Sequence, residues 1–224
     1  MVVVFDLDDT LYPESAYVLS ALQAVGELGE DRMGLTGFAL ALRRLFESGQ
    51  RTKLFQTAIA ELNRPAPTAE DLEALLAAYR NHRPARLDWH PDALGLVKAL
   101  HARYPLAIIS DGYMPTQRLK AEALGVDRWF THVVFTEEFG RAFWKPSARA
   151  FESVMQTFPG ENFVYIGDNL AKDFVAPRAL GWNTIYVRRP DGIHKDALPP
   201  AHGAPRHKVS DLAEAASLFS AEAR

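Results

Sequence analysis

The chain has 224 residues, of which 48% are hydrophobic and none is cysteine, and its formal net charge at pH 7 is −3. This length fits one full-sized core plus a smaller insert. The negative charge argues against a nucleic-acid binder, which usually presents a basic face, and the lack of cysteine excludes disulfides and thiol nucleophiles. No apolar run approaches the roughly 20 residues that span a bilayer, and the N-terminal run is too short for a signal peptide. We therefore expect a cytoplasmic protein with no nucleic-acid or membrane partner.

Five short apolar runs predict the strands of a sheet. They are β-branched or aromatic and lack clean alternation, which is typical of strands buried on both faces. The runs occupy residues 2–5, 106–110, 132–135, 162–167 and 183–187. Helical patterns at 91–104, 115–126 and 146–158 precede the second, third and fourth runs. This alternation predicts an α/β fold with a Rossmann-like parallel sheet flanked by helices. The loop-like stretch 189–207 is expected to lead to a last short strand and a C-terminal helix.

Between the first two runs lies a segment with no convincing strand. Its helix-like stretches are 15–30, 36–48, 51–62 and 69–82. Thr68, with Asp71 three residues later, resembles a capping box that opens the last of these helices. We predict a core domain of residues 1–13 and 86–224, and a small all-helical cap domain of residues 14–85 inserted after the first strand.

Polar clusters follow three of the predicted strands. "DLDDT" begins at Asp6, "SDG" at Ser110 and "GDNLAKD" at Gly167. In an open parallel sheet, ligands bind outside the carboxyl ends of the strands. If the backbone stays extended, Asp6 and Asp8 point the same way and Asp9 points elsewhere. Taken singly, each cluster could be an ordinary acidic turn or a helix N-cap, but their order and placement together favour a functional site.

These motifs, together with Lys145, resemble the signature of the haloacid dehalogenase (HAD) superfamily. That signature is a DxDxT/V loop, a Ser or Thr after the second strand, a Lys before a later helix, and an acidic GDxxxxD. Its counterparts here are Asp6 to Thr10, Ser110, Lys145, and Asp168 with Asp173. The helical insert resembles the C1 cap of that superfamily. The stretch that begins at Gly167 looks like its nucleotidase and acylneuraminate-phosphatase relatives.

A metal ion is expected where the acidic residues converge. Four carboxylates in one place stay ionised only if a cation neutralises them or some are protonated. Oxygen-only donors favour a hard ion such as Mg²⁺. The resemblance implies Asp6 and Asp168 as direct ligands, the backbone carbonyl of Asp8 as a third, and Asp173 acting through water.

The resemblance also implies a Mg²⁺-dependent phosphatase acting on a small phosphomonoester, either a nucleoside monophosphate or a sugar phosphate. Asp6 would attack phosphorus and form an aspartyl-phosphate, and Asp8 would be the general acid and base. Lys145 and Ser110 would hold phosphate oxygens. The backbone N–H groups of Asp111 and Gly112 would bind the phosphate too, and Thr10 would orient Asp8 or the loop.

Two alternatives stay open: a phosphomutase on the same core, and a non-catalytic binding or regulatory protein of this fold. A dehalogenase is disfavoured because those relatives lack the second aspartate, which is present here as Asp8. Phosphonate hydrolysis is disfavoured because the only lysine of the insert, Lys53, lies far from its start. Candidate substrate contacts are Tyr12, Arg43, Arg44, Arg51, Lys53, His82, Arg83, Arg86 and Tyr113. Substrate identity and oligomeric state are not predicted.

Overall fold

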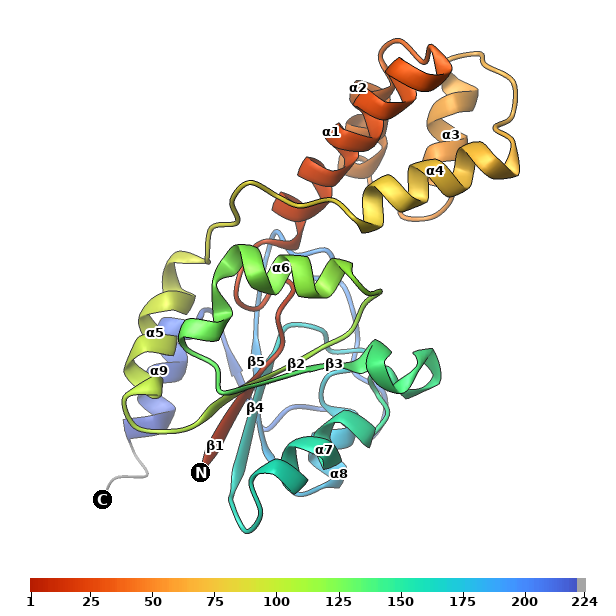
Figure 1. Ribbon diagram of the computed structural model, residues 1–224. Coiled ribbons are helices and arrows are strands. Elements are labelled where there is room, and N and C mark those ends of the chain that lie inside the picture. Colours follow the sequence, from red (N-terminus) through yellow and green to blue (C-terminus); the bar gives the residue numbers. More distant parts are fainter. Residues whose placement is uncertain (221–224) are drawn as a thin grey trace. The chain divides into compact units, whose positions relative to one another are not determined.

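The computed structural model describes residues 1–220, and the chain divides into two compact units. The core unit contains Met1–Glu14 and the chain from Arg86 onward. The helical unit contains Ser15–Ala85. Figure 1 draws the elements of both units and labels them. In the described residues, no helix is both long enough and apolar enough to cross a membrane.

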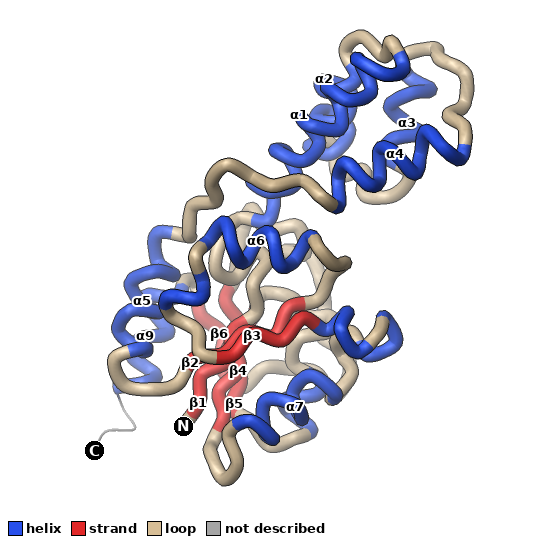
Figure 2. The backbone as a smooth tube through the Cα atoms, in the orientation of Figure 1, coloured by secondary structure: helices blue, strands red, loops and turns tan. Residues whose placement is uncertain are grey.

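A six-stranded parallel sheet forms the centre of the core unit (Figure 2). Its strands are β1 (Val2–Phe5), β2 (Leu106–Ser110), β3 (His132–Phe135), β4 (Phe163–Gly167), β5 (Asn183–Val187) and β6 (His207–Val209). The order across the sheet is β3-β2-β1-β4-β5-β6, which is the doubly wound order of Rossmann folds. Strand β1 is central and pairs with both β2 and β4, so that Phe5 lies opposite Ile108 and Ile166. The predicted fold class is confirmed.

The strands form where they were predicted because each is a short apolar run covered on both faces. Every residue of β1, β2 and β4 is buried, whereas the first two residues of β3 are partly exposed at the sheet edge. A hydrophobic cluster on one face includes Phe151, Tyr165 and Trp182. The Phe151 ring centroid lies 5.1 Å from that of Tyr165 and 5.4 Å from that of Trp182, both edge-on, a favoured aromatic geometry.

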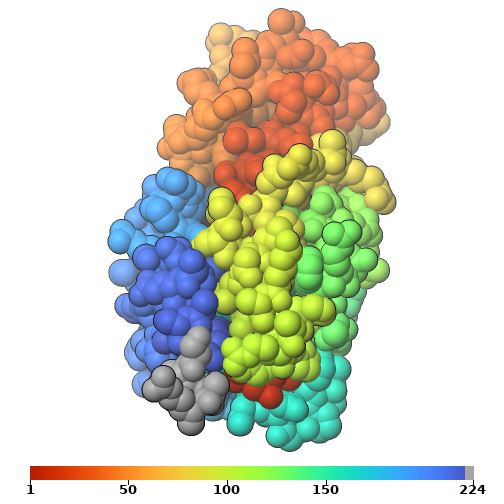
Figure 3. Space-filling view, turned by 90° about the vertical axis from the view of Figure 1, so that its left-hand side faces the viewer, coloured from red at the N-terminus to blue at the C-terminus, as the bar shows by residue number. Residues whose placement is uncertain are grey.

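Helices cover both faces of the sheet (Figure 1). The helices of the core unit are α5 (Pro91–His101), α6 (Thr116–Leu124), α7 (Arg149–Thr157), α8 (Val175–Ala179) and α9 (Leu212–Ser220). Short 3₁₀ turns lie at η1 (Val126–Arg128), η2 (Thr136–Phe139) and η3 (Arg141–Phe143). Helices α7 and α8 pack on one face, and α5 lies beside α9 on the other (Figure 3). Residues 221–224 of the predicted core domain lie outside the described residues.

One predicted helix start was wrong. The helix expected over 146–158 begins only at Arg149, because the backbone N–H of Lys145 is tied to Asp111 Oδ1 at 3.0 Å and residues 145–147 form a turn. After β4, residues 170–174 form a turn, and α8 starts at Val175. Asp173 Oδ2 accepts the N–H of Asn169 at 2.9 Å, which holds this segment as a turn.

Four helices make up the helical unit: α1 (Glu14–Met33), α2 (Phe38–Glu47), α3 (Leu54–Glu61) and α4 (Ala69–Arg80). The predicted capping box is present, since Thr68 and Asp71 exchange side-chain to backbone hydrogen bonds at the start of α4. Gly26 lets α1 and α2 approach closely, because a Cβ there would lie 2.4 Å from Ala39 Cα. The phenol of Tyr17 donates to the carbonyl of Tyr79 at 3.1 Å and so links α1 to α4.

Candidate active site

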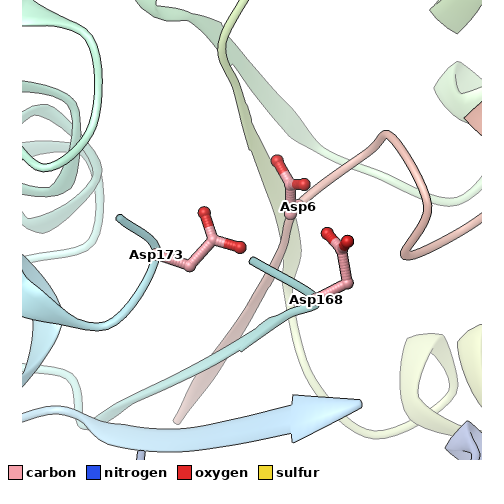
Figure 4. Close-up of side chains that lie close together, drawn as sticks. All are labelled: Asp6, Asp168 and Asp173. Atoms are coloured by element: carbon pink, nitrogen blue, oxygen red, sulfur yellow. The ribbon is translucent and has the colours of Figure 1, made fainter. Parts of the chain in front are cut away.

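Three buried carboxylates meet at the carboxyl edge of the sheet. Asp6 follows β1, Asp168 follows the adjacent strand β4, and Asp173 lies in the turn before α8. Each offers a carboxylate oxygen, and these oxygens all lie within 4.8 Å of one another. Figure 4 shows the three carboxylates pointing toward one another. The structure therefore brings together three of the four acidic residues predicted to bind metal.

A buried lysine shares this cluster. Lys145 Nζ donates to Asp6 Oδ1 at 2.6 Å and to the Tyr165 hydroxyl at 2.9 Å, and it lies 2.8 Å from Asp173 Oδ1. Burial alone would lower the pKa of Lys145, but Asp173 and Asp6 outweigh burial and raise it well above 10.5. The ammonium group therefore stays charged in this site.

One ammonium does not balance three ionised carboxylates, since two negative charges remain. Burial, followed by the charge of Asp173, raises the pKa of Asp6 to about 7 against the opposing effect of Lys145. Burial and the charges of Asp173 and Asp6 also raise the pKa of Asp168 well above 3.8. A divalent cation would relieve this repulsion, because it favours the charged form of every carboxylate near it.

The donor set also fits a metal ion. Asp173 Oδ1 is buried and faces Lys145 Nζ at 2.8 Å, but among the described residues no group gives it a hydrogen bond of good geometry, so this oxygen can still bind a cation. Gly167 provides the room for this carboxylate, because a Cβ at position 167 would lie 2.5 Å from Asp173 Oδ2. All three side chains offer oxygen only, which matches the preference of hard ions such as Mg²⁺.

The predicted phosphate-binding loop follows β2. Ser110 ends that strand and is fully buried. The Asp111 side chain anchors the neighbouring segments, because its Oδ1 accepts from Thr136 Oγ1 at 2.8 Å and from the Lys145 N–H, and its Oδ2 accepts from Lys172 Nζ at 2.7 Å. These lysines outweigh burial and lower the pKa of Asp111. Gly112 has a φ of 143°, a backbone conformation that residues other than glycine rarely adopt.

Asp8 lies in a separate polar cluster. Its Oδ1 accepts from the Tyr12 hydroxyl at 2.5 Å and from Lys120 Nζ at 2.8 Å, and its Oδ2 accepts from Gln117 Nε2 at 2.7 Å. Burial would raise the pKa of Asp8, but Lys120 outweighs it, so the pKa falls below 3.8. The Asp8 side chain is not one of the three clustered carboxylates, and the metal contact predicted for its backbone carbonyl stays a prediction.

The next two residues hold the loop in shape. Asp9 has a φ of 51°, and its carboxylate accepts from the N–H groups of Glu14 at 2.8 Å and Ile193 at 2.7 Å. It therefore points away from the carboxylate cluster, as the period-two argument predicted. Thr10 is buried and its Oγ1 donates to Asp168 Oδ1 at 3.4 Å. The expectation was that Thr10 orients Asp8 or the loop, and the hydrogen bond that the structure gives its hydroxyl is to Asp168, which follows β4.

The sequence motifs did not point to several residues that belong to this site. Gln117 and Lys120 come from α6, Tyr165 from β4, and Lys172 from within "GDNLAKD". Lys172 pairs with Asp111 and is only partly exposed. The sequence does carry a signal for two of these residues. Positions 117, 120, 121 and 124 lie on one face of the predicted helix. The two polar residues on that face, Gln117 and Lys120, are buried together with the apolar ones.

Most of the predicted substrate contacts already have partners within their own unit. Tyr12 bonds Asp8, Arg51 lies 4.3 Å from the Phe46 ring centroid, and His82 Nε2 lies 2.8 Å from Ser20 Oγ. Ion pairs join Arg43 to Glu47, Arg44 to Glu61, and Arg86 to Asp88. The Tyr113 ring packs edge-on against Trp144. Contact with substrate stays a prediction for all nine.

Comparisons with known proteins agree with this geometry. Residues 1–181 match the family model of haloacid dehalogenase-like hydrolases. The chain is 27% identical to a glyceraldehyde 3-phosphate phosphatase from Methanopyrus kandleri, over 88% of this chain and 87% of that protein. It is 29% identical to a ribulose-1,5-bisphosphate 5-phosphatase from Halopiger xanaduensis, over 97% of this chain and 98% of that protein.

The fold is likewise similar to a solved structure. The magnesium-bound form of the putative HAD-hydrolase YfnB from Bacillus subtilis superposes with a TM-score of 0.68, at 20% identity, over 97% of each chain. At that identity the likeness shows the fold alone. Because the family model covers most of the chain, including every motif of the candidate site, the protein belongs to the haloacid dehalogenase-like hydrolase family and is a hydrolase.

Proposed function

We propose that this protein is a Mg²⁺-dependent phosphatase that hydrolyses a small phosphomonoester through an aspartyl-phosphate on Asp6. The observation that carries the proposal is the meeting of Asp6, Asp168 and Asp173 around Lys145. Phosphoryl transfer is governed largely by charge and positioning. A buried cluster of carboxylates with a fixed ammonium group suits that chemistry.

Asp6, Asp168 and Asp173 are the residues that would hold the ion, as their clustered carboxylate oxygens suggest. When bound, Mg²⁺ supplies the positive charge that lets an anionic carboxylate approach an anionic phosphate. Lys145 adds a second, permanent positive charge beside the Asp6 carboxylate. The Ser110 hydroxyl and the N–H groups of Asp111 and Gly112 then bind the remaining phosphate oxygens.

In the first step an Asp6 carboxylate oxygen bonds to phosphorus while the bond from phosphorus to the ester oxygen breaks. The leaving oxygen takes a proton from Asp8 and departs as an alcohol. Asp8 must therefore be protonated when substrate is bound. The negative charge of a bound phosphate favours that protonation, against the lowering effect of Lys120.

In the second step Asp8, now ionised, takes a proton from a water molecule whose oxygen bonds to phosphorus. The bond from phosphorus to Asp6 breaks, which releases inorganic phosphate and restores the Asp6 carboxylate. Lys120, Tyr12 and Gln117 all donate to Asp8, and so they hold the carboxylate in one orientation for both proton transfers.

For the substrate we propose a phosphorylated small sugar. The two sequence relatives are named for acting on glyceraldehyde 3-phosphate and ribulose 1,5-bisphosphate, and each is aligned over more than four-fifths of its length. Both names describe phosphate esters of short polyhydroxylated chains. A nucleoside monophosphate is the other class that the sequence motifs suggest, and a substrate panel separates the two.

The test is a panel of triose, pentose and hexose phosphates and nucleoside monophosphates, assayed for released phosphate with Mg²⁺ and with chelator. We expect Mg²⁺-dependent release that is greatest for sugar phosphates and is lost in Asp6→Asn. Isomerisation of a sugar phosphate without phosphate release would identify a mutase instead. Equal slow release by the wild type and Asp6→Asn would mean a non-catalytic protein.

A further inference from the structure

We infer that Gln117 is a positioning residue that couples the proton-transfer side chain, Asp8, to the phosphate-binding hydroxyl of Ser110. This inference rests on the proposed function and deepens it. Gln117 lies on α6, between the two predicted groups, and only 1% of its surface is exposed. A buried amide must satisfy its hydrogen bonds with protein groups, so its partners show what it organises.

The Gln117 amide nitrogen contacts three oxygens. Nε2 lies 2.7 Å from Asp8 Oδ2, 2.7 Å from Ser110 Oγ and 2.8 Å from the carbonyl oxygen of Asp111. A carboxylate and a backbone carbonyl can only accept hydrogen bonds. Were the amide turned over, its oxygen would face two acceptors at hydrogen-bonding distance, which is repulsive. The surroundings therefore fix Nε2 as the atom that faces this group.

This orientation sets the direction of the hydrogen bond at Ser110. An amide nitrogen cannot accept a hydrogen bond, so Ser110 Oγ can only be an acceptor in its contact with Gln117. Because the amide carries two hydrogens for three oxygens, one of its N–H groups is shared between two acceptors. That bond is the one hydrogen bond of Ser110 Oγ within the described chain. The hydroxyl hydrogen is therefore left to donate, and an oxygen of the substrate phosphate is the acceptor that the proposed mechanism places there. Gln117 thus orients Ser110 for binding an anion.

The space around Gln117 is matched to its side chain. A Cβ at position 112 would lie 2.6 Å from Gln117 Cδ, so Gly112 leaves room for the amide below the loop. Asp8 has two further donors, Lys120 and Tyr12, whereas Gln117 is the one donor to Ser110 Oγ among the residues that the structure describes. Loss of the amide should therefore disturb Ser110 more than Asp8, and weaken phosphate binding more than turnover.

The experiment compares Gln117→Met, which keeps the length but removes the donor, with Gln117→Glu, which keeps the shape but presents acceptors. The readouts are KM and kcat for a sugar phosphate, and the dissociation constant of inorganic phosphate from the Mg²⁺-loaded protein, measured by calorimetry. Gln117→Met should weaken phosphate binding by about tenfold, with a smaller fall in kcat. Gln117→Glu should weaken it further, because Ser110 then donates to the glutamate.

A double-mutant cycle separates positioning from a general structural effect. In a Ser110→Ala background the Gln117→Met change should alter phosphate binding by less than about twofold. The same loss in both backgrounds would overturn the inference, as would unchanged phosphate binding in both Gln117 variants. Arg118→Gln, on the exposed face of α6 and paired with Glu138, is the matched control and should bind like wild type. Phosphate binding needs no turnover, so a wild type that binds phosphate but hydrolyses no ester would refute the proposed function alone.

Discussion

Lys145 Nζ lies 2.6 Å from Asp6 Oδ1, although the two residues are 139 positions apart in the chain. Asp6 continues the central strand β1, and Lys145 lies in the turn before α7. The lysine side chain is fully buried, so this contact exists only because the fold imposes it. A buried ammonium beside a cluster of carboxylates is costly unless each charge is matched, so Lys145 and the carboxylates stabilise the fold only as a set.

Replacing Lys145 by Met should destabilise the metal-free protein by roughly 3–5 kcal/mol, because Asp6 and Asp173 lose their buried counter-charge. Lys172→Met is the matched control, since Lys172 pairs with Asp111 and is partly exposed; it should cost less. Urea unfolding in the presence of chelator measures both. An equal loss of unfolding free energy in the two variants would show that Lys145 does not stabilise the buried carboxylates more than an ordinary ion pair does.

The close approach of Gly167 to Asp173 gives a second prediction. Gly167→Ala places a Cβ 2.5 Å from Asp173 Oδ2, so the carboxylate must move away from Asp6 and Asp168. We expect metal affinity to fall by on the order of tenfold or more, measured by titration calorimetry. Gly95→Ala, in α5 with nothing within 4 Å of the added Cβ, should bind metal normally. Unchanged affinity in Gly167→Ala would remove Asp173 from the proposed site.

The raised pKa of Asp6 predicts how metal and pH act together on stability. Burial, then the charge of Asp173, raises this pKa from 3.8 to about 7. A carboxyl with a raised pKa stabilises the fold fully below pH 3.8, and that contribution is lost as pH rises through 7. In chelator, the melting temperature should therefore fall between pH 5.5 and pH 8.

Magnesium should reverse that loss, because bound metal requires ionised ligands. At a hundred times its dissociation constant, Mg²⁺ should raise the melting temperature by roughly 5–10 °C at pH 8, and by less at pH 5.5. Differential scanning calorimetry at both pH values checks this, with Asp168→Asn as the variant that should respond least. An Mg²⁺ effect larger at pH 5.5 than at pH 8 contradicts the assignment.

Asp8→Asn should separate the two chemical steps. General acid–base catalysis contributes on the order of 10²–10⁴-fold, so steady-state hydrolysis of a sugar phosphate should fall within that range. A nitrophenyl ester needs no proton on its leaving group, and it should therefore still phosphorylate Asp6. Stopped-flow absorbance should show a burst of nitrophenolate of about one equivalent, followed by slow turnover. Loss of the burst together with turnover would mean that Asp8 acts in a different way.

The sheet could be predicted from the sequence because the signal for each strand, a short apolar run, lies within a few consecutive residues. Runs such as Val2–Phe5 are apolar from end to end, and the alternation with helices leaves few arrangements of a parallel sheet. The clustering of Asp6 with Asp168 followed for the same reason, since both end neighbouring strands. These inferences need only the fact that parallel strands run in the same direction, so that their carboxyl ends meet at one edge of the sheet.

The remaining contacts depend on tertiary packing. The hydrogen bond from Thr10 to Asp168 could not be predicted, because it depends on the left-handed conformation of Asp9 and on the packing of the loop beside β4. Gln117 lies within the predicted helix 115–126, and its contacts with Asp8 and Ser110 arise only when α6 packs beside the ends of β1 and β2. Helical periodicity shows which residues share a face, but not which strand end that face meets.

The central claim is that Asp6 becomes covalently phosphorylated. Its most direct test is a rapid acid quench of the Asp8→Asn variant with Mg²⁺ and substrate, followed by borohydride reduction and peptide mass spectrometry. An aspartyl-phosphate is reduced to an alcohol, so we predict homoserine at position 6 and unmodified aspartate at positions 9, 168 and 173. Reduction at another aspartate, or none in a sample that has released its alcohol, would contradict the account.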